Sequence, residues 1–181
     1  KHIATLTGHT SSVDRISFSP DGQILAYSGV NQTIRLCQMP DGRPLATLTD
    51  HTDSVYRISF SPDGQLLASY GNDQTIKLWQ MPTGHPLATL TGHTGHIEGI
   101  TFSPDSQILA SHSEDEDNAI RLWQMPTGHP LATLTGHTSY VYKVSFSPDS
   151  QILASQTLVN DETIRLWQMP TGYPLATLTG H

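Results

Sequence analysis

The heptapeptide LATLTGH stands at residues 87–93, 131–137 and 175–181 of this chain. Two close copies, LATLTDH at 45–51 and IATLTGH at 3–9, bring the number of copies to five. A second marker, the triplet Ser-Pro-Asp, recurs at intervals of 42, 42 and 44 residues, beginning at Ser19, Ser61, Ser103 and Ser147. A fixed interval of this length is typical of a repeated supersecondary unit. The sequence therefore predicts an array of four such units.

Each repeat contains four short runs rich in Val, Ile, Leu, Thr and aromatic residues. In the second repeat they are VYRISFSP at 55–62, QLLAS at 65–69, TIKLWQ at 75–80 and PLATLT at 86–91. Runs of this composition between turn residues predict β-strands. Ser-Pro-Asp-Gly between the first two runs has the preferred residues of a type I turn, which also tolerates the Ser106 and Ser150 of later copies. No segment has the apolar periodicity of a helix.

The order of short motifs in each repeat resembles that of the WD-repeat family. In the third repeat these motifs are Gly92-His93, Phe102-Ser103-Pro104-Asp105, Leu109-Ala110-Ser111, Ile120-Arg121-Leu122-Trp123 and Thr127-Gly128. One departure is uniform, because the Asp that follows Trp in the family is Gln80, Gln124 or Gln168 here. The resemblance implies an all-β protein built of four four-stranded antiparallel propeller blades. The near-identical copies are similar to recently amplified bacterial arrays.

The repeat boundaries predict a surplus outer strand and four blades. The surplus strand is residues 1–9, and the blades are residues 10–51 (degenerate), 52–93, 94–137 and 138–181. Propellers of this family, by resemblance, suit about seven or eight blades, and open blade faces are apolar. We therefore expect two copies to complete an eight-bladed ring as a homodimer, with two outer strands competing for the edge at each junction.

The resemblance also implies a buried hydrogen-bonded set in each blade, formed by His, Ser, Asp and Trp. These sets are His51, Ser69, Asp73 and Trp79 in the second blade, His93, Ser111, Asp117 and Trp123 in the third, and His137, Ser155, Asp161 and Trp167 in the fourth. A buried indole N–H needs an acceptor, which a Ser hydroxyl provides. The Ser, His and Asp imitate a hydrolase triad, but a triplicated arrangement under Trp predicts no catalytic residue.

The first repeat departs from this pattern. It has Tyr27, Asn31 and Cys37 where Ser, Asp and Trp are expected. Cys37 is interpreted as a small apolar residue in the place of the Trp, and not as a functional thiol. Because most of the set is lost, the first blade is expected to be the least stable of the four.

The segments that enter each inner strand vary while the framework hardly changes. Variation confined to one rim is expected of a recognition surface, with Tyr side chains as anchors, although neutral drift at exposed positions produces the same pattern. The candidate partner-binding residues are Asp14, Tyr56, His96, Glu98, Tyr140 and Tyr142, with Glu116 and Asn160 from two inserted loops. The insertions, residues 113–116 and 157–160, are expected on the same rim; the acidic one fits a basic peptide or calcium, but a solvated loop is favoured.

Composition limits the classes of partner. The formal charge of -7 disfavours nucleic acids and anionic membranes, and no apolar run is long enough to span a bilayer. A single cysteine excludes an internal disulfide and fits a reducing, cytoplasmic location, and no metal or cofactor motif is present. The sequence thus predicts a non-catalytic scaffold or interaction module for a protein or peptide partner. The alternatives are an excised or engineered set of blades with a structural role only, and a small-ligand or enzymatic site at the channel mouth using His96, Glu98 and Tyr142.

Overall fold

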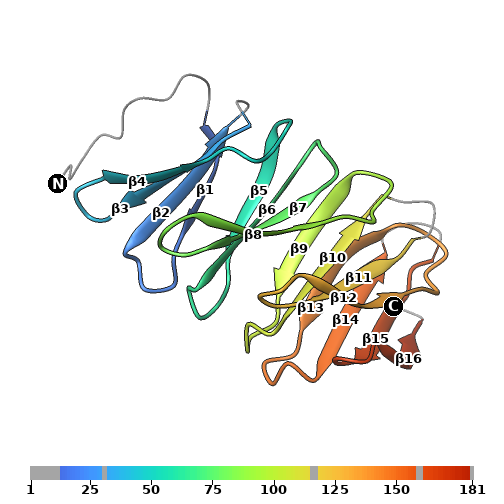
Figure 1. Ribbon diagram of the computed structural model, residues 1–181. Coiled ribbons are helices and arrows are strands. Elements are labelled where there is room, and N and C mark those ends of the chain that lie inside the picture. Colours follow the sequence, from blue (N-terminus) through green and yellow to red (C-terminus); the bar gives the residue numbers. More distant parts are fainter. Residues whose placement is uncertain (1–12, 30–31, 115–117, 158–160, 180–181) are drawn as a thin grey trace. The chain divides into compact units, whose positions relative to one another are not determined.

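The structure is a computed structural model that describes residues 13–29, 32–114, 118–157 and 161–179. These residues form four separate sheets of four strands each, and no helix (Figure 1). Within every sheet the strands lie side by side in their order along the chain, and each neighbouring pair is antiparallel. The predicted all-β class with four four-stranded antiparallel blades is confirmed.

Each sheet is called a blade and numbered in chain order. Blade 1 contains β1 (Val13–Phe18), β2 (Ile24–Gly29), β3 (Ile34–Gln38) and β4 (Arg43–Leu48). Blade 2 contains β5 (Val55–Phe60), β6 (Leu66–Gly71), β7 (Ile76–Gln80) and β8 (His85–Leu90). Blade 3 contains β9 (Ile97–Phe102), β10 (Ile108–Ser113), β11 (Ile120–Gln124) and β12 (His129–Leu134). Blade 4 contains β13 (Val141–Phe146), β14 (Ile152–Thr157), β15 (Ile164–Gln168) and β16 (Tyr173–Leu178).

The turn after each inner strand is held by its own Ser and Asp side chains. In blade 2 the Ser61 hydroxyl donates to Asp63 Oδ1, and Ser61 Oγ accepts the Leu66 amide at 3.0 Å. The Gly64 amide donates to the Ser61 carbonyl at 2.9 Å, which closes the turn. Because these bonds use only residues of the Ser-Pro-Asp motif and its neighbours, each copy of the motif makes the same turn.

The fourth residue of this turn adopts a left-handed backbone conformation in all four blades. Its φ is 68° at Gly22 and 72° at Gly64, and also 61° at Ser106 and 62° at Ser150. A residue with a Cβ is disfavoured there by about 1 kcal/mol. Ser150 gains a contact in return, because its hydroxyl oxygen accepts the Asp105 amide of the neighbouring turn at 3.1 Å.

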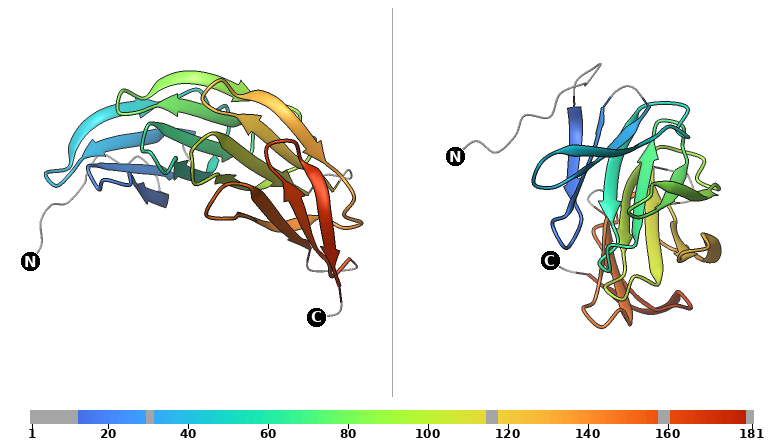
Figure 2. Two further views of the ribbon diagram at one scale, coloured as in Figure 1. Left: turned by 90° about the horizontal axis from the view of Figure 1, so that it is seen from below. Right: turned by 60° about the vertical axis from the view of Figure 1, so that its left-hand side comes forward.

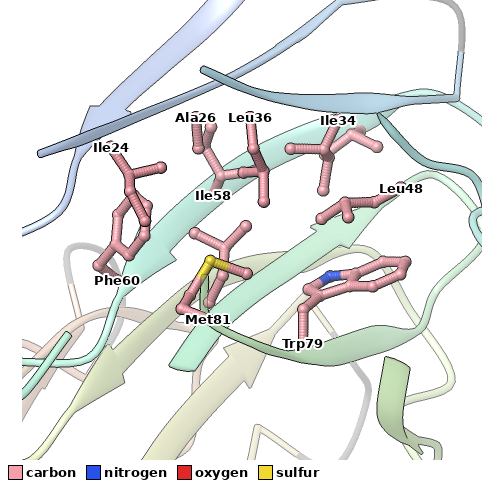
Figure 3. Packing of buried hydrophobic residues seen from close by; sticks show 11 residues of the cluster. Ile24, Ala26, Ile34, Leu36, Leu48, Ile58, Phe60, Trp79 and Met81 are labelled. Atoms are coloured by element: carbon pink, nitrogen blue, oxygen red, sulfur yellow. The ribbon is translucent and has the colours of Figure 1, made fainter. Parts of the chain in front are cut away.

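The chain divides into two compact units, Lys1–Thr91 and Gly92–His181, each of which contains two blades. In the first unit, one face of blade 1 packs on one face of blade 2 (Figure 3). Blade 1 contributes aliphatic side chains and blade 2 a mixture of aliphatic, aromatic and sulfur-containing ones. These are Ile24, Ala26, Ile34, Leu36 and Leu48 of blade 1, and Val55, Ile58, Phe60, Leu67, Trp79 and Met81 of blade 2.

The second unit repeats this interface with the equivalent residues of blades 3 and 4. Blade 3 contributes Ile108, Ala110, Ile120, Leu122 and Leu134, and blade 4 contributes Val141, Val144, Leu153, Trp167 and Met169. Figure 2 shows the strands of each blade from two other directions. Each interface within a unit therefore joins two kinds of apolar face. The leading face, on the second to fourth strands of blade 1 or 3, packs on the trailing face of blade 2 or 4, which includes the first strand. The equivalent residues of the other blades are given the same two names.

Candidate functional site

The four members of the blade 2 set lie within hydrogen-bonding distance of one another. The indole Nε1 of Trp79 donates to Ser69 Oγ at 2.9 Å, and Ser69 Oγ lies 2.7 Å from His51 Nε2. His51 Nδ1 lies 2.8 Å from Asp73 Oδ2. These residues come from β6, β7 and the segments beside them, so the set ties the middle of the sheet to the loop that precedes it.

The chemistry of these groups fixes the direction of every bond in the set. An indole N–H only donates, so Ser69 Oγ is its acceptor and the hydroxyl proton is left for His51 Nε2. The neutral imidazole then carries its proton on Nδ1 and donates it to Asp73. A proton added at Nε2 would deprive the Ser69 hydroxyl of its acceptor, so the set favours neutral His51.

Burial lowers the pKa of His51 below its ordinary value of 6.5, and the Asp73 carboxylate offsets this only in part. Burial also opposes ionisation of Asp73, but hydrogen bonds from His51, from Thr75 and from the Thr52 amide together hold its pKa below 3.8. Near neutral pH the set therefore contains a neutral imidazole and an ionised carboxylate.

Blade 4 repeats this geometry. Trp167 Nε1 donates to Ser155 Oγ at 2.8 Å, and His137 lies 2.7 Å from Ser155 Oγ and 2.9 Å from Asp161 Oδ2. Burial lowers the pKa of His137, with partial compensation from Asp161. Although burial opposes it, hydrogen bonds from Thr163, the Thr138 amide and His137 lower the pKa of Asp161 to about 2.

Blade 3 has a member that the sequence did not predict. Trp123 Nε1 donates to Ser111 Oγ at 2.8 Å and His93 Nε2 lies 2.7 Å from the same oxygen, whereas His93 Nδ1 lies 2.7 Å from Ser113 Oγ. Asp117, which was expected at this imidazole nitrogen, lies outside the described residues. Ser113 follows Ser111 by two positions, and residues two apart on a strand share a face, so this spacing was the available signal.

The expectation that the insertions begin at residues 113 and 157 is wrong. Ser113 is the last residue of β10 and Thr157 the last of β14, because both continue their strand's pairing with the inner strand. Residues 115–117 and 158–160, with Glu116 and Asn160, lie outside the described residues.

Blade 1 fills the place of the set with a different pair. Tyr27 takes the position of Ser69 and Cys37 that of Trp79, and both are buried in a small cluster with Leu25 and Met39. Burial, followed by the nearby Cys37 thiol, raises the pKa of Tyr27. The other two positions of the set are Asn31 and His9, which ends the heptapeptide copy at 3–9, and both lie outside the described residues.

The hydroxyls of the polar sets are enclosed by the blades. Ser69 and Ser111 have no exposed surface, and each oxygen is already engaged by a Trp and a His. A nucleophile needs room for a substrate carbonyl beside it and for a group that stabilises the oxyanion. In this geometry the sets stabilise the blades by satisfying buried polar groups.

A one-residue bulge marks the entrance of every inner strand. In blade 2, Val55 pairs with Gly71 and Arg57 with Tyr70, so Tyr56 has no residue opposite it. The same register shift occurs in each of the other blades, where the extra residues of the inner strand are Asp14, Glu98 and Tyr142. A bulge turns its extra side chain away from the regular alternation of the strand, and bulges are frequent beside functional sites.

The sequence contains a signal for this bulge that periodicity alone reveals. The apolar residues of the inner strand are separated by three positions and then by two, as in Val55, Ile58 and Phe60. A regular strand would place Val55 and Ile58 on opposite faces, yet both are buried in one interface. The extra residue between them is therefore required.

The structure locates most of the predicted rim residues at these entrances. Tyr56, His96, Glu98 and Tyr142 are exposed and Tyr140 is partly buried, whereas the Asp14 side chain is not described. In blades 2 and 3 the loop after the second strand lies beside the entrance, since the Asn72 amide donates to the Ser54 carbonyl at 2.9 Å and the Glu114 amide to the His96 carbonyl at 3.0 Å.

A cavity of about 240 Å³ in the second unit lies at the other end of the strands. It is lined by residues of the turns and strand ends of blades 3 and 4, among them Asp105, Gln107, Gln124, Ser150 and Met169. His96, Glu98 and Tyr142, which the alternative of a small-ligand or enzymatic site invoked, do not line it.

The trailing face of blade 1 and the leading face of blade 4 leave apolar side chains exposed. On blade 1 these are Val13, Ile16 and Phe18 of β1, and on blade 4 they are Ile152 of β14 and Leu178 of β16. The equivalent residues in the interfaces within each unit are buried or nearly so. Exposed apolar surface of this kind is a candidate contact site.

The residues that the structure describes hold no helix long and apolar enough to cross a membrane. Nor do they bring three or more His, Cys, Asp or Glu side chains together in a group that could hold a metal ion.

Repeated four-stranded antiparallel blades, each with a polar set or its remnant at the centre, define the class of β-propeller repeat proteins. The family model described as WD domain, G-beta repeat matches residues 1–37, 42–80, 84–124 and 128–168. The chain therefore belongs to the WD40 family. WD40 domains generally mediate protein–protein interaction and are typically non-enzymatic. A comparison with curated proteins found no match.

Proposed function

We propose that this chain is a non-catalytic scaffold that binds a protein or peptide partner at the inner-strand entrances. The bulge at the same position of all four blades supports this proposal, because it inserts one extra residue per blade at the entrance of the inner strand. The residue so presented differs in character from blade to blade, as Asp14, Tyr56, Glu98 and Tyr142, within an almost constant framework.

The two tyrosines are the strongest anchors on the proposed surface. Tyr56 is 41% exposed and Tyr142 is 53% exposed, although neighbouring apolar residues of the same strands are buried. Tyr is enriched among the residues that dominate binding energy, since it offers a large apolar ring and a hydroxyl. His96 and Tyr140 precede the strands, and the proposed surface also includes Glu116 and Asn160 of the adjoining loops.

The proposed function goes together with the blade boundaries and the cellular location that the sequence predicts. Residues 10–51, 52–93, 94–137 and 138–181 are taken as the blades and residues 1–9 as a surplus outer strand. A bacterial cytoplasm is the proposed location. The buried free thiol of Cys37 is compatible with a reducing compartment.

A selection from a random peptide library tests the entrances. Peptides selected on the wild-type chain should lose at least about tenfold in affinity on Tyr56→Ala or Tyr142→Ala, which is the loss expected of a central anchor. Tyr173→Ala is the matched control, because this tyrosine is 66% exposed but lies on an outer strand. Binding that resists both entrance substitutions, or that falls equally with the control, would contradict the proposal.

A second copy of the chain is the second candidate partner. The exposed apolar faces of blades 1 and 4 favour self-association, and two copies supply the eight blades of a ring. We propose a homodimer that closes such a ring. Sedimentation equilibrium at micromolar concentration should give twice the mass of one 19.8 kDa chain, and a mass of one chain would refute the homodimer.

A further inference from the structure

We infer that the homodimer is joined head to tail, with the leading face of blade 4 in one copy seated on the trailing face of blade 1 in the other. This inference rests on the proposed self-association and adds which surfaces meet and in which direction. It is carried by the residue-by-residue equivalence between the two exposed faces and the two interfaces seen within the chain.

The trailing face of blade 1 has nearly the same residues as the trailing face of blade 2. Ile16 is equivalent to Ile58 and Phe18 to Phe60, since both pairs occupy the same registers of the inner strand. Ile16 is 67% exposed and Phe18 is 55% exposed, whereas Ile58 and Phe60 are 6% and 8% exposed under the leading face of blade 1. The side chains are thus the same, and only the covering blade is missing.

The leading face of blade 4 also lacks a covering blade. Leu178 of β16 is equivalent to Leu134 of β12, which is buried against blade 4. Leu178 is 46% exposed and Leu134 is 3% exposed. The same holds for Ile152, which is exposed, and its equivalent Ile108, which is buried.

These two faces are the halves of one interface type. The interface within each unit pairs a leading face with a trailing face, and neither of these two interfaces pairs faces of one kind. In a leading face the outer-strand leucine packs with residues of the next blade that include its Trp and Met. Two faces of one kind would instead bring together side chains that have no described precedent for packing. The head-to-tail arrangement covers both exposed faces of each copy.

The junction between copies differs from the others at one position. Cys37 stands on the trailing face of blade 1 where Trp79 and Trp167 stand in the interfaces within the chain. Leu178 would therefore lie opposite a smaller residue, already buried within blade 1, than its equivalents Leu48 and Leu134 do. Less apolar area is removed from water at such a contact, so the junction between copies is weaker than the interface within each unit.

Single substitutions to Asp on each face test the assignment. Leu178→Asp and Ile16→Asp each place a carboxylate in both junctions of the dimer, and each should weaken association by at least about a hundredfold, because an unpaired charge would be buried. Both residues are exposed in a single copy, so its fold should be unaffected. Thr177→Asp, beside Leu178 on the same strand, is the control that should remain dimeric.

Mixing the two variants tests the direction of the junction. The copy with Ile16→Asp keeps an intact blade 4 face and the copy with Leu178→Asp keeps an intact blade 1 face, so an equimolar mixture should form mixed pairs through one intact junction. If the wild type is a dimer and either variant alone still forms a dimer, the head-to-tail inference is overturned, while self-association remains supported. Variants that are monomeric alone and also when mixed would overturn it too, whereas a monomeric wild type would refute the self-association itself.

Discussion

Blade 1 and blade 2 have the same strand registers but different centres. In both blades the first and second strands pair around a one-residue bulge, and the third and fourth strands shift register at the same place. Blade 2 fills its centre with small Ser69 and large Trp79, whereas blade 1 has large Tyr27 and small Cys37 at the same two positions. The exchange of sizes keeps both centres buried.

This comparison separates what builds a blade from what stabilises it. The backbone ladder and the Ser-Pro-Asp turn recur in blade 1 although the Ser and Trp of the polar set are absent. The set is therefore not needed for the topology. It adds stability by satisfying a buried indole, hydroxyl and imidazole, and by linking the sheet to the loop before it.

The largest expected effect comes from giving blade 2 the residue of blade 1. Trp79→Cys removes a fully buried indole without providing a large partner in exchange, and should lower the free energy of unfolding by about 3–5 kcal/mol. Urea unfolding of the variant against wild type measures this loss. Gln80→Ala, at an exposed neighbour, is the control, and a loss below about 1 kcal/mol for Trp79→Cys would contradict the comparison.

Ser69→Ala tests the polar set without creating a large cavity. It leaves the Trp79 Nε1 donor and the His51 Nε2 acceptor buried without the hydroxyl between them, at a cost of about 1–3 kcal/mol. The matched control is Ser59→Ala on the inner strand of the same blade, whose hydroxyl makes only a 3.5 Å contact. Equal losses for the two variants would show that the set contributes nothing specific.

The exchanged sizes in blade 1 should appear as coupling in a double-mutant cycle. Cys37→Trp alone overfills the centre beside Tyr27, and Tyr27→Ser alone leaves it underfilled, so each should destabilise by about 1–3 kcal/mol. The double variant restores the arrangement of blade 2 and should lose less than the sum of the two. Losses that simply add would mean that Tyr27 and Cys37 do not share one space.

Hydrogen exchange compares the two blades in the unmodified chain. Amides of β2 and β3 should exchange at least about tenfold faster than the equivalent amides of β6 and β7, because blade 1 lacks the bonds of the set. The measurement is made at one pH on the whole chain, so neighbouring blades serve as internal references. Equal protection in the two blades would contradict the expected lower stability of blade 1.

The polar sets should also make stability depend on pH. His51 and His137 have folded pKa values below 6.5, so the unfolded chain binds their protons first, and stability falls as pH drops below about 6.5. The slope is at most about 1.4 kcal/mol per pH unit for each histidine. The low pKa values of Asp73 and Asp161 add a further loss below about pH 3.8.

Thermal unfolding between pH 7.5 and pH 5 measures the histidine contribution. Replacing His51 and His137 by Gln should flatten this dependence, although it also lowers stability at neutral pH. His85→Gln, on the exposed start of β8, should leave the dependence as in wild type. A wild-type chain with no loss of stability on acidification would contradict the neutral, buried state assigned to His51 and His137.

Much of the fold followed from the sequence because its signals are local and repeated. The interval between Ser-Pro-Asp triplets, the runs of strand-forming residues and the turn composition act within a few residues of one another, and together they predict four blades of four strands. The bulge that presents Tyr56 was also encoded, in the three-residue step from Val55 to Ile58, but a fixed alternation of inward and outward residues did not reveal it.

The polar sets were less evenly predictable. The motifs that carry the resemblance indicated which His, Ser and Trp would be close together, since their order is the same in blades 2, 3 and 4. Ser follows His by 18 residues in all three blades, and Trp follows Ser by 10 or 12 residues. The contact between Ser113 and His93 depended on where β10 ends, and the length of a strand is decided by its pairing with β9. The sequence indicated which residues lie at the entrance of each inner strand. Only the structure showed how exposed their side chains are.

Ile16 and Ile58 show that the sequence alone does not determine which residues are buried. Their residue type, strand and register were determined by the repeat itself, because strand formation depends on side chains and turns within one unit. Burial depends on what packs against the finished sheet, and only the tertiary structure gives that. The leading face of blade 1 covers Ile58 and leaves it 6% exposed, whereas Ile16 is 67% exposed. Identical residues thus belong in one case to a core and in the other to an exposed surface, because the hydrophobic effect acts on neighbours in space and not on neighbours in sequence.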